Sequence, residues 1–384
     1  MKKLLSCLVS IGVLTSTLLS FGSSTSFAAT QSVLLGDANG DNKVTYADVG
    51  AIQQYLLGYC PVTAKSFTGM DVNQDKIIDS TDAYIIQYRL AYNISAPTVQ
   101  KELYTLPDNS TRSYIKYTCD TGATTNYTLS NSTTSSNADF DYPVATVSEE
   151  FDNENTNVVQ LTRNGVFVGS GFVISENIIA TAAHCVYNEN GFLNNISVNI
   201  YNEQSEAEPE NLIATFEAES YHIPVSYLNR LGAYLNDLNY DYALIYVGTD
   251  SQGNDLLDYA SPWQFAIPSL EFSEAEIGQL TTTGFTRYTN NGELVLARYY
   301  STGIVDNLSN NDVNNPQLRI ASSATNNYGK SGGPMYYTST YNNSVNKSVV
   351  GITTHFHEYP NYHYSLGTKI NLTLLRFYKQ NPYI

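Results

Sequence analysis

The sequence predicts a mainly β protein in which a large C-terminal unit of short strands follows a small helical unit near the N-terminus. Between residues 144 and 384, short apolar or alternating runs recur between turns rich in Gly, Asn and Pro. Such a pattern favours an antiparallel barrel or sandwich. Between residues 33 and 95 an acidic motif occurs twice, and an apolar run follows each copy.

The composition excludes two classes of partner. The net charge is −17, and charged residues make up only 14% of the chain. Nucleic acids and anionic membrane surfaces repel such a chain, so we expect neither as a partner.

The N-terminus has the pattern of a secretory signal peptide over residues 1–28. A basic Met-Lys-Lys start precedes an apolar run, and small side chains precede the expected cleavage after Ala28. A membrane anchor is the alternative, but the run is short for a span and contains Ser and Thr. We therefore expect a secreted, extracellular protein.

Three cysteines would remain after cleavage, namely Cys60, Cys119 and Cys185. They are scattered and odd in number, so they form no disulfide framework. A single disulfide that involves Cys185 remains open, and the sequence does not say which cysteine is its partner.

The acidic motif has the spacing of a calcium-binding loop. Side-chain oxygens stand at loop positions 1, 3 and 5, a carboxylate stands at position 12, and position 7 supplies its backbone carbonyl, as a hard cation requires. The alternative is a pair of Asp/Asn-rich turns without metal, but two copies in register argue against it. The expected ligands of two calcium ions are Asp37, Asn39, Asp41, Lys43 and Asp48 in the first copy and Asp71, Asn73, Asp75, Ile77 and Asp82 in the second.

Each loop leads into a predicted helix, over 49–57 and 83–90. Val44 and Ile78, both at loop position 8, are expected to join the two loops through a short strand-like pairing. A domain of about 60 residues buries little surface, so calcium should contribute directly to its folding.

Residues 33–95 resemble a type I dockerin domain in loop length, in Asp at position 12 and in duplication. The resemblance implies a cohesin domain of a cellulosome-like scaffold as the partner. In dockerins the cohesin-facing surface includes loop positions 10 and 11, which here are Tyr46–Ala47 and Ser80–Thr81. Because the two pairs differ, the two faces are expected to bind a cohesin unequally.

Residues 96–143 are rich in Thr, Ser and Asn. Such a composition predicts an extended linker, or a propeptide, in which 114–117 is a candidate short strand. Residues 144–384 then form the main domain. Its tail is expected to be a short helix, capped by Asn371, that docks on the barrel through Leu374, Leu375 and Tyr378.

Three fragments of the main domain carry chemistry. His184 ends an apolar strand with small residues before it, Asp241 begins a buried strand, and Ser331 has glycines on both sides. A serine hydroxyl becomes a good nucleophile when a base takes its proton and an acid orients that base. Asp237 and His222 are competing candidates for the acid and the base, but neither lies in a matching motif.

The same Ser331 loop loosely matches a phosphate-binding loop, with Ala324 in place of the first glycine. That site needs a helix to begin at the Lys-Ser pair. Gly332-Gly333-Pro334 leads into a strand-like run instead, so the match is accidental.

The main domain resembles the trypsin-like serine proteases, most closely the bacterial glutamyl-endopeptidase branch, on TAAHC at 181–185 and GKSGGP at 329–334. The resemblance implies a chymotrypsin-like fold of two six-stranded β-barrels. It assigns His184 as general base, Asp241 as its orienting acid and Ser331 as nucleophile, with backbone N–H groups of Gly329 and Ser331 as the oxyanion hole.

Four departures from the family pattern qualify the resemblance. Cys185 lacks its usual cysteine partner around Gly169–Gly171, and Lys330 replaces the Asp that locks trypsin after activation. Thr325 stands where trypsin carries its pocket Asp, so cleavage after Lys or Arg is disfavoured. His355 lies two positions from the histidine that reads acidic side chains in glutamyl endopeptidases.

The sequence therefore predicts a secreted serine endopeptidase that acts on proteins or peptides and needs no cofactor for catalysis. An inactive protease-like adaptor bound to cohesin and an esterase using the same triad are the alternatives.

Overall fold

The computed structural model describes most of the chain from residue 30 onward. The described residues are 30–56, 62–104, 112–129, 150–188, 190–204, 206–228, 240–268, 279–290, 293–306, 319–324, 326–341, 344–359, 362–370, 374 and 377–378. The signal-peptide prediction for 1–28 lies outside them.

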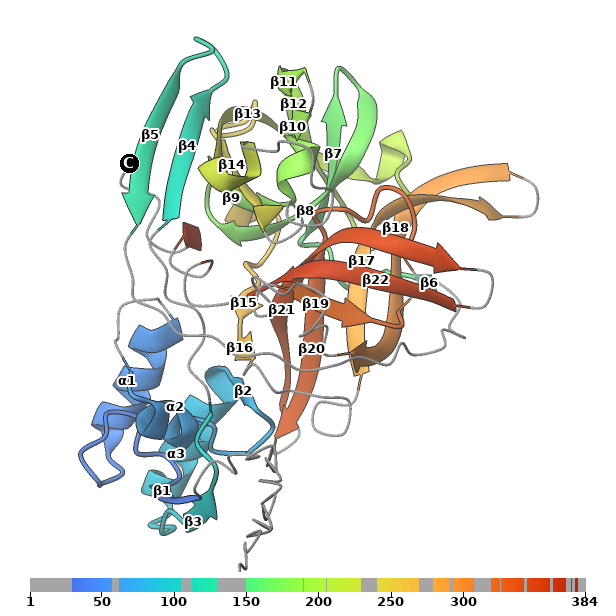
Figure 1. Cartoon of the computed structure of the whole chain (residues 1–384). Helices are drawn as coiled ribbons and strands as arrows, with labels where there is room; N and C mark the ends of the chain where they lie inside the picture. The colour runs from blue at the N-terminus through green and yellow to red at the C-terminus, as the bar shows by residue number, and fades with distance from the viewer. Residues whose placement is uncertain are drawn as a thin grey trace, which may run out of the picture.

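The helical unit contains α1 (Tyr46–Leu56), α2 (Ala64–Met70) and α3 (Ser80–Ala91). Helices α1 and α3 follow the acidic loops as predicted, whereas α2 was not predicted. At the start of α3, the Asp79 carboxylate accepts the Thr81 N–H at 2.6 Å and so caps the helix. An antiparallel pair, β1 (Gln31–Leu34) with β3 (Thr98–Lys101), joins the two ends of this unit (Figure 1).

Two closed barrels form the main domain, as predicted. In the first barrel the strands follow the order β12-β7-β8-β9-β14-β13, and β13 pairs with β12 to close the ring. These strands are β7 (Val158–Arg163), β8 (Val166–Ser175), β9 (Ile178–Thr181), β12 (Ile196–Tyr201), β13 (Leu212–Pro224) and β14 (Ala243–Val247).

The second barrel follows the order β21-β20-β17-β18-β19-β22 and closes through the β21–β22 pair. Its strands are β17 (Gln279–Asn290), β18 (Glu293–Asp306), β19 (Arg319–Ser322), β20 (Pro334–Tyr341), β21 (Ser344–Tyr359) and β22 (Tyr362–Lys369). Two short strands extend it, β6 (Glu150–Phe151) on β18 and β15 (Gln264–Phe265) on β21. The chymotrypsin-like fold prediction is thus confirmed.

The segment expected to be a linker, 96–143, differs from that expectation in its described part. Besides β3, it contains β4 (Arg112–Thr118) and β5 (Thr124–Leu129), and β4 pairs with β13 of the first barrel (Figure 1). The reason is aromatic burial: Tyr114 is fully buried and its ring lies 4.4 Å from that of Phe377. The candidate strand at 114–117 lies within β4.

The expected pairing between Val44 and Ile78 is wrong. Ile78 belongs instead to β2 (Ile77–Ile78), which pairs with β16 (Ile267–Pro268) of the main domain. Ile77 and Ile78 are both buried, and Ile77 packs with Leu280 and Met335 of the barrel, so this apolar pair finds its partner there.

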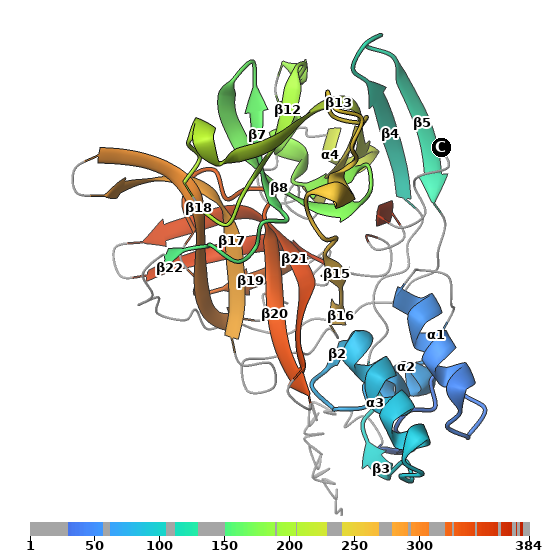
Figure 2. The ribbon, with the colours of Figure 1, turned by 180° about the vertical axis from the view of Figure 1, so that it is seen from behind.

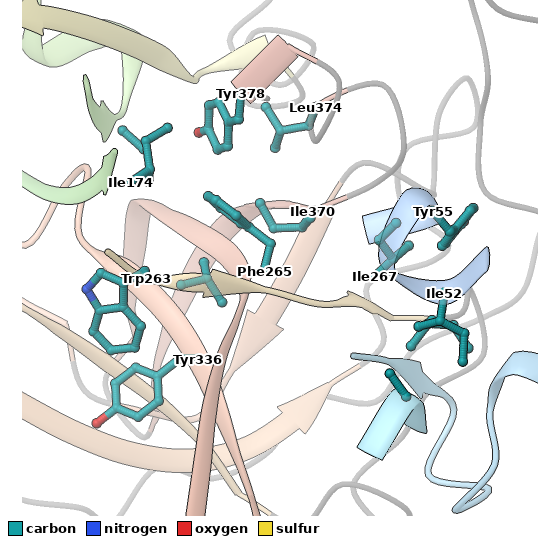
Figure 3. Packing of buried hydrophobic residues seen from close by; sticks show 14 of the residues in the cluster. Ile52, Tyr55, Ile174, Trp263, Phe265, Ile267, Tyr336, Ile370, Leu374 and Tyr378 are labelled. Carbon is teal, nitrogen blue, oxygen red and sulfur yellow. The ribbon is translucent and has the colours of Figure 1, made fainter. Parts of the chain in front are cut away.

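A shared apolar cluster connects the helical unit with both barrels. Ile52 and Tyr55 of α1 pack in one cluster with Phe265 of β15 and Ile267 of β16 (Figure 3). Leu374 and Tyr378 of the C-terminal tail are helical and buried in the same cluster, as expected, and Phe377 joins them there. Asn371 and Leu375 lie outside the described residues. From behind, the helical unit and the β4–β5 hairpin flank the same side of the two barrels (Figure 2).

Within the described part of the chain, no helix combines the length and the apolar character needed to cross a membrane.

Candidate functional site

The pairing of β9 with β14 brings the first two candidate residues together. His184 lies in a short 3₁₀ turn directly after β9, and Asp241 lies just before β14. Because Thr181 pairs with Ala243, the end of one strand meets the start of the other. His184 Nδ1 lies 2.7 Å from Asp241 Oδ2, and the His184 backbone N–H donates to Asp241 Oδ1 at 3.0 Å. Two contacts therefore fix the imidazole relative to the carboxylate.

Charge and burial oppose each other in this pair. Burial alone would lower the pKa of His184, but the Asp241 carboxylate holds that pKa well above its usual range. Burial would likewise raise the pKa of Asp241, and the His184 imidazole lowers it instead. The carboxyl side chain is 2% exposed and the imidazole 30% exposed, so the acid is sealed while the base reaches the cleft.

Ser331 lies in a tight loop that two glycines make possible. Gly329 has a φ of +107° and Gly332 a φ of +86°, which side chains rarely adopt. A Cβ at Gly332 would lie 2.1 Å from the carbonyl oxygen of Ser170. Among the described residues, the N–H groups of Gly329 and Ser331 have no acceptor, so both are available as donors to a ligand in the cleft.

The Ser331 hydroxyl donates to the backbone carbonyl of Thr354 at 3.2 Å. Among the described contacts it does not bond to His184. Catalysis by Ser331 would therefore require Oγ to leave the Thr354 carbonyl by rotation about the Cα–Cβ bond to another staggered rotamer.

Ser170 is a residue that sequence reasoning missed. Its backbone N–H donates to the Ser331 carbonyl, and its hydroxyl donates to the Gly329 carbonyl, both at 2.8 Å. The same hydroxyl accepts the Phe285 N–H of β17 at 2.8 Å. Ser170 on β8 of the first barrel thus holds the Ser331 loop and the second barrel together. The only signal in the sequence was its position between two glycines.

A cleft of about 780 Å³ lies over these groups. His184 and the Ser331 loop both line this cleft. Neither sequence motif alone could establish that the two lie close together. Its lining residues are Phe167, Val168, His184, Arg287, Asn327, Tyr328, Gly329 and Ser331.

Of the two competing candidates the structure describes His222, which does not line this cleft. His222 is buried in β13, where its Nδ1 lies 2.9 Å from the Tyr127 hydroxyl. Asp237 and Thr325 lie outside the described residues. Lys330, which follows Gly329, is fully buried. His355 does not line the cleft, but its ring lies 5.7 Å from that of His184.

The described cysteines, Cys119 and Cys185, are both free thiols. A Cβ at Gly169 would lie 2.6 Å from the Cys185 Sγ. Glycine thus occupies the place from which a cysteine partner would face Cys185. Cys60 lies outside the described residues.

The two acidic loops have the same internal hydrogen bonds. The position-12 carboxylates accept the backbone N–H of position 2, from Ala38 to Asp48 at 2.9 Å and from Val72 to Asp82 at 2.7 Å. The carboxylate at position 12 thereby ties the end of each loop to its beginning.

The charge distribution in these loops fits a calcium ion. Asp37 Oδ1 and Asp71 Oδ1, both at position 1, are buried and lack a hydrogen-bond partner. Burial raises the pKa of Asp71 to about 6, and burial with the nearby charges of Asp79 and Asp71 raises that of Asp82 well above its usual range. Crowded buried carboxylates without a compensating charge are what a bound cation stabilises.

No cluster of three His, Cys, Asp or Glu side chains suited to a metal occurs among the described residues. The loop donor set differs from such a cluster, because it includes Asn39, Asn73 and the backbone carbonyls of Lys43 and Ile77. A calcium ion would supply charge neutralisation and would hold each loop closed when bound.

Comparison with protein families identifies both units. The trypsin family model matches residues 147–373, more than half of the 384-residue chain. The model of the type I dockerin domain matches residues 35–91. No curated protein matches the chain.

Proposed function

Because the chain belongs to the trypsin family, we propose that it is a secreted serine endopeptidase that hydrolyses peptide bonds with His184, Asp241 and Ser331. The observation that supports this most is the 2.7 Å contact of His184 Nδ1 with a sealed Asp241, in one cleft with Ser331.

The chemistry follows from this geometry. After rotation from Thr354, Ser331 Oγ attacks the scissile carbonyl carbon while His184 Nε2 takes its proton. Asp241 keeps the Nδ1–H of His184 in place and stabilises the imidazolium that forms. The N–H groups of Gly329 and Ser331 bind the oxyanion, and each such donor is worth about 3 kcal/mol in the transition state.

Collapse of the tetrahedral intermediate breaks the C–N bond, and the imidazolium gives its proton to the leaving amine. A water molecule then attacks the acyl-enzyme, with His184 again accepting the proton. The products are a free carboxylate and a free amine, and Ser331 is regenerated.

The proposal includes a preference for acidic residues before the cleaved bond, as in glutamyl endopeptidases. It is supported by Arg287, an exposed cation among the residues that line the cleft. A cationic cleft attracts Asp or Glu and repels Lys or Arg.

The dockerin domain is the proposed means of attachment. Type I dockerin domains bind calcium, and the two loops of this chain present the expected donors. We propose two structural calcium ions and a cohesin domain of an extracellular scaffold as the partner.

Labelling by a fluorophosphonate tests the enzyme proposal. Ser331 should become labelled, and Ser331→Ala should abolish labelling and lower kcat by about six orders of magnitude. An intact, folded protein that resists labelling would favour the inactive adaptor. Digestion of a peptide library, with an ester substrate alongside, separates endopeptidase from esterase and reads the residue before the cleaved bond.

A further inference from the structure

The two acidic loops differ in what surrounds them, although they share one internal geometry. At loop position 7, Lys43 is exposed in the first copy, whereas Ile77 is fully buried in the second. At position 11, Ala47 is exposed, whereas Thr81 is 7% exposed. The second copy is covered by another part of the chain.

The cover is the second barrel, and its apolar part centres on β2. Ile77 packs in a cluster with Leu280, Met335 and Val350 of that barrel. Ile78 pairs with Ile267 in an antiparallel ladder. Figure 3 shows Ile267 reaching Ile52 and Tyr55 of the helical unit.

Specific polar contacts surround this apolar centre. Asp79 Oδ2 accepts from Asn346 Nδ2 and from the Ser348 hydroxyl, both at 3.1 Å. The hydroxyl of Thr81 lies 3.0 Å from that of Ser339 on β20. These contacts are buried or half-buried, so they define one orientation rather than a loose encounter.

Of the cohesin-facing pair in the second copy, Thr81 is buried in this contact, and Ser80 lies exposed at its edge. The Ser80 hydroxyl donates to Gln264 Oε1 at 2.8 Å, and Thr81 is covered by β20. The first copy is open at the equivalent place, since Tyr46 is 65% exposed and Gln53 and Gln54 on α1 are exposed.

We infer that the second acidic repeat is an internal docking element, bound to the second barrel through Ile77, Asp79 and Thr81. A cohesin module therefore engages only the first-repeat face, at Tyr46 and Ala47. The second half of this inference rests on the proposed attachment to a cohesin, whereas the docking itself does not.

Disulfide trapping tests the docking without any partner. In the full chain carrying Ser331→Ala, the pair Thr81→Cys and Ser339→Cys should form a crosslink under mild oxidation, since the two hydroxyls are 3.0 Å apart. The matched control, Ala47→Cys with Ser339→Cys, places the thiol on the open repeat and should not crosslink. Equal crosslinking in both pairs, or none in the first pair, would overturn the docking.

Cohesin binding tests which face is used. With recombinant type I cohesin modules as probes, the oxidised Thr81→Cys/Ser339→Cys protein should bind within about twofold of the unmodified chain. Tyr46→Ser combined with Ala47→Thr, which copies the second pair, should weaken binding by at least about tenfold. Loss of binding on locking, or no effect of the Tyr46 and Ala47 changes, would refute the assignment.

The two failures remain distinguishable. If the crosslink forms but the protein binds no cohesin, the proposed attachment to cohesin and the assignment of the first-repeat face are both wrong. The docking of the second repeat on the second barrel is then still supported. Thermal unfolding of each variant checks that it is folded.

Discussion

Asp241 in the cleft and Asp71 in the second acidic loop are both buried carboxylates, but their charges are compensated in different ways. Asp241 faces the His184 imidazole, and its pKa is lowered. Burial raises the pKa of Asp71 to about 6, even though Lys101 Nζ lies 3.5 Å away. In this contrast the chain itself supplies the positive partner of Asp241, whereas the proposed calcium ion would supply that of Asp71.

The largest test of this contrast removes the charge of Asp241 alone. Asp241→Asn keeps the shape but accepts only weakly from the His184 Nδ1–H, so the wrong imidazole tautomer is favoured. We expect kcat to fall by about four orders of magnitude. Steady-state kinetics on the best library peptide would measure it, and a loss below tenfold would show that Asp241 is not the orienting acid.

The pH profile sharpens the same point. His184 must be neutral to accept the Ser331 proton, and Asp241 raises the pKa of His184. The value of kcat/KM should therefore drop about tenfold per pH unit below a pKa higher than about 6.5. In Asp241→Asn the acidic limb of the residual activity should shift to lower pH, because no carboxylate then favours the imidazolium form of His184. An unchanged limb would mean that another group titrates.

Calcium removal is the corresponding test of the acidic loops. At calcium a thousand times above its Kd, chelation should lower the free energy of unfolding by about 4 kcal/mol. Trp263, the single tryptophan, lies in the cluster that joins the helical unit to the barrels and reports the transition by fluorescence. A thermal midpoint that is the same in calcium and in EDTA would contradict the calcium proposal.

The sequence predicts those site residues that lie in a local pattern. The His184 and Ser331 motifs and the two acidic loops could be found because small residues, glycines and alternating oxygens stand at fixed spacings. Ser170 could not be found, since its role depends on β8 meeting the Ser331 loop, 161 residues later in the chain. A contact between distant strands leaves almost no trace in either strand alone.

The same limit explains the errors around the helical unit. The calcium-loop pattern assigns Ile77 at loop position 7 only the role of a backbone carbonyl ligand, although the first copy has Lys43 at the same position. The replacement of a charged residue in the first copy by an apolar one in the second is the sign of the docking that the sequence carries. The polar composition of 96–143 predicts an extended linker or a propeptide, but the burial of Tyr114 overrides that signal in β4.

Exchanging the position-7 residues compares the two repeats directly. Ile77→Lys places a charge in the apolar cluster of the second barrel and should cost about 3 kcal/mol or more of stability. Lys43→Ile changes an exposed site and should stay within about 0.5 kcal/mol. Chemical denaturation followed by Trp263 fluorescence would measure both, and equal costs would break the distinction between an open and a docked repeat.

The smallest expected effect isolates one polar contact between the two units. The Tyr337 hydroxyl on β20 donates to Asp75 Oδ2 of the second loop. Tyr337→Phe removes this donor while keeping the ring, so stability should drop by about 1.5 kcal/mol, the usual worth of a hydrogen bond to a charged group. The matched control is Tyr336→Phe, because the Tyr336 hydroxyl accepts from Asn155 within the main domain at 3.2 Å. A loss of stability that depends on calcium in Tyr337→Phe, but not in Tyr336→Phe, would link the second loop to the barrel. Identical calcium dependence in the two variants would show that the barrel does not respond to the state of that loop.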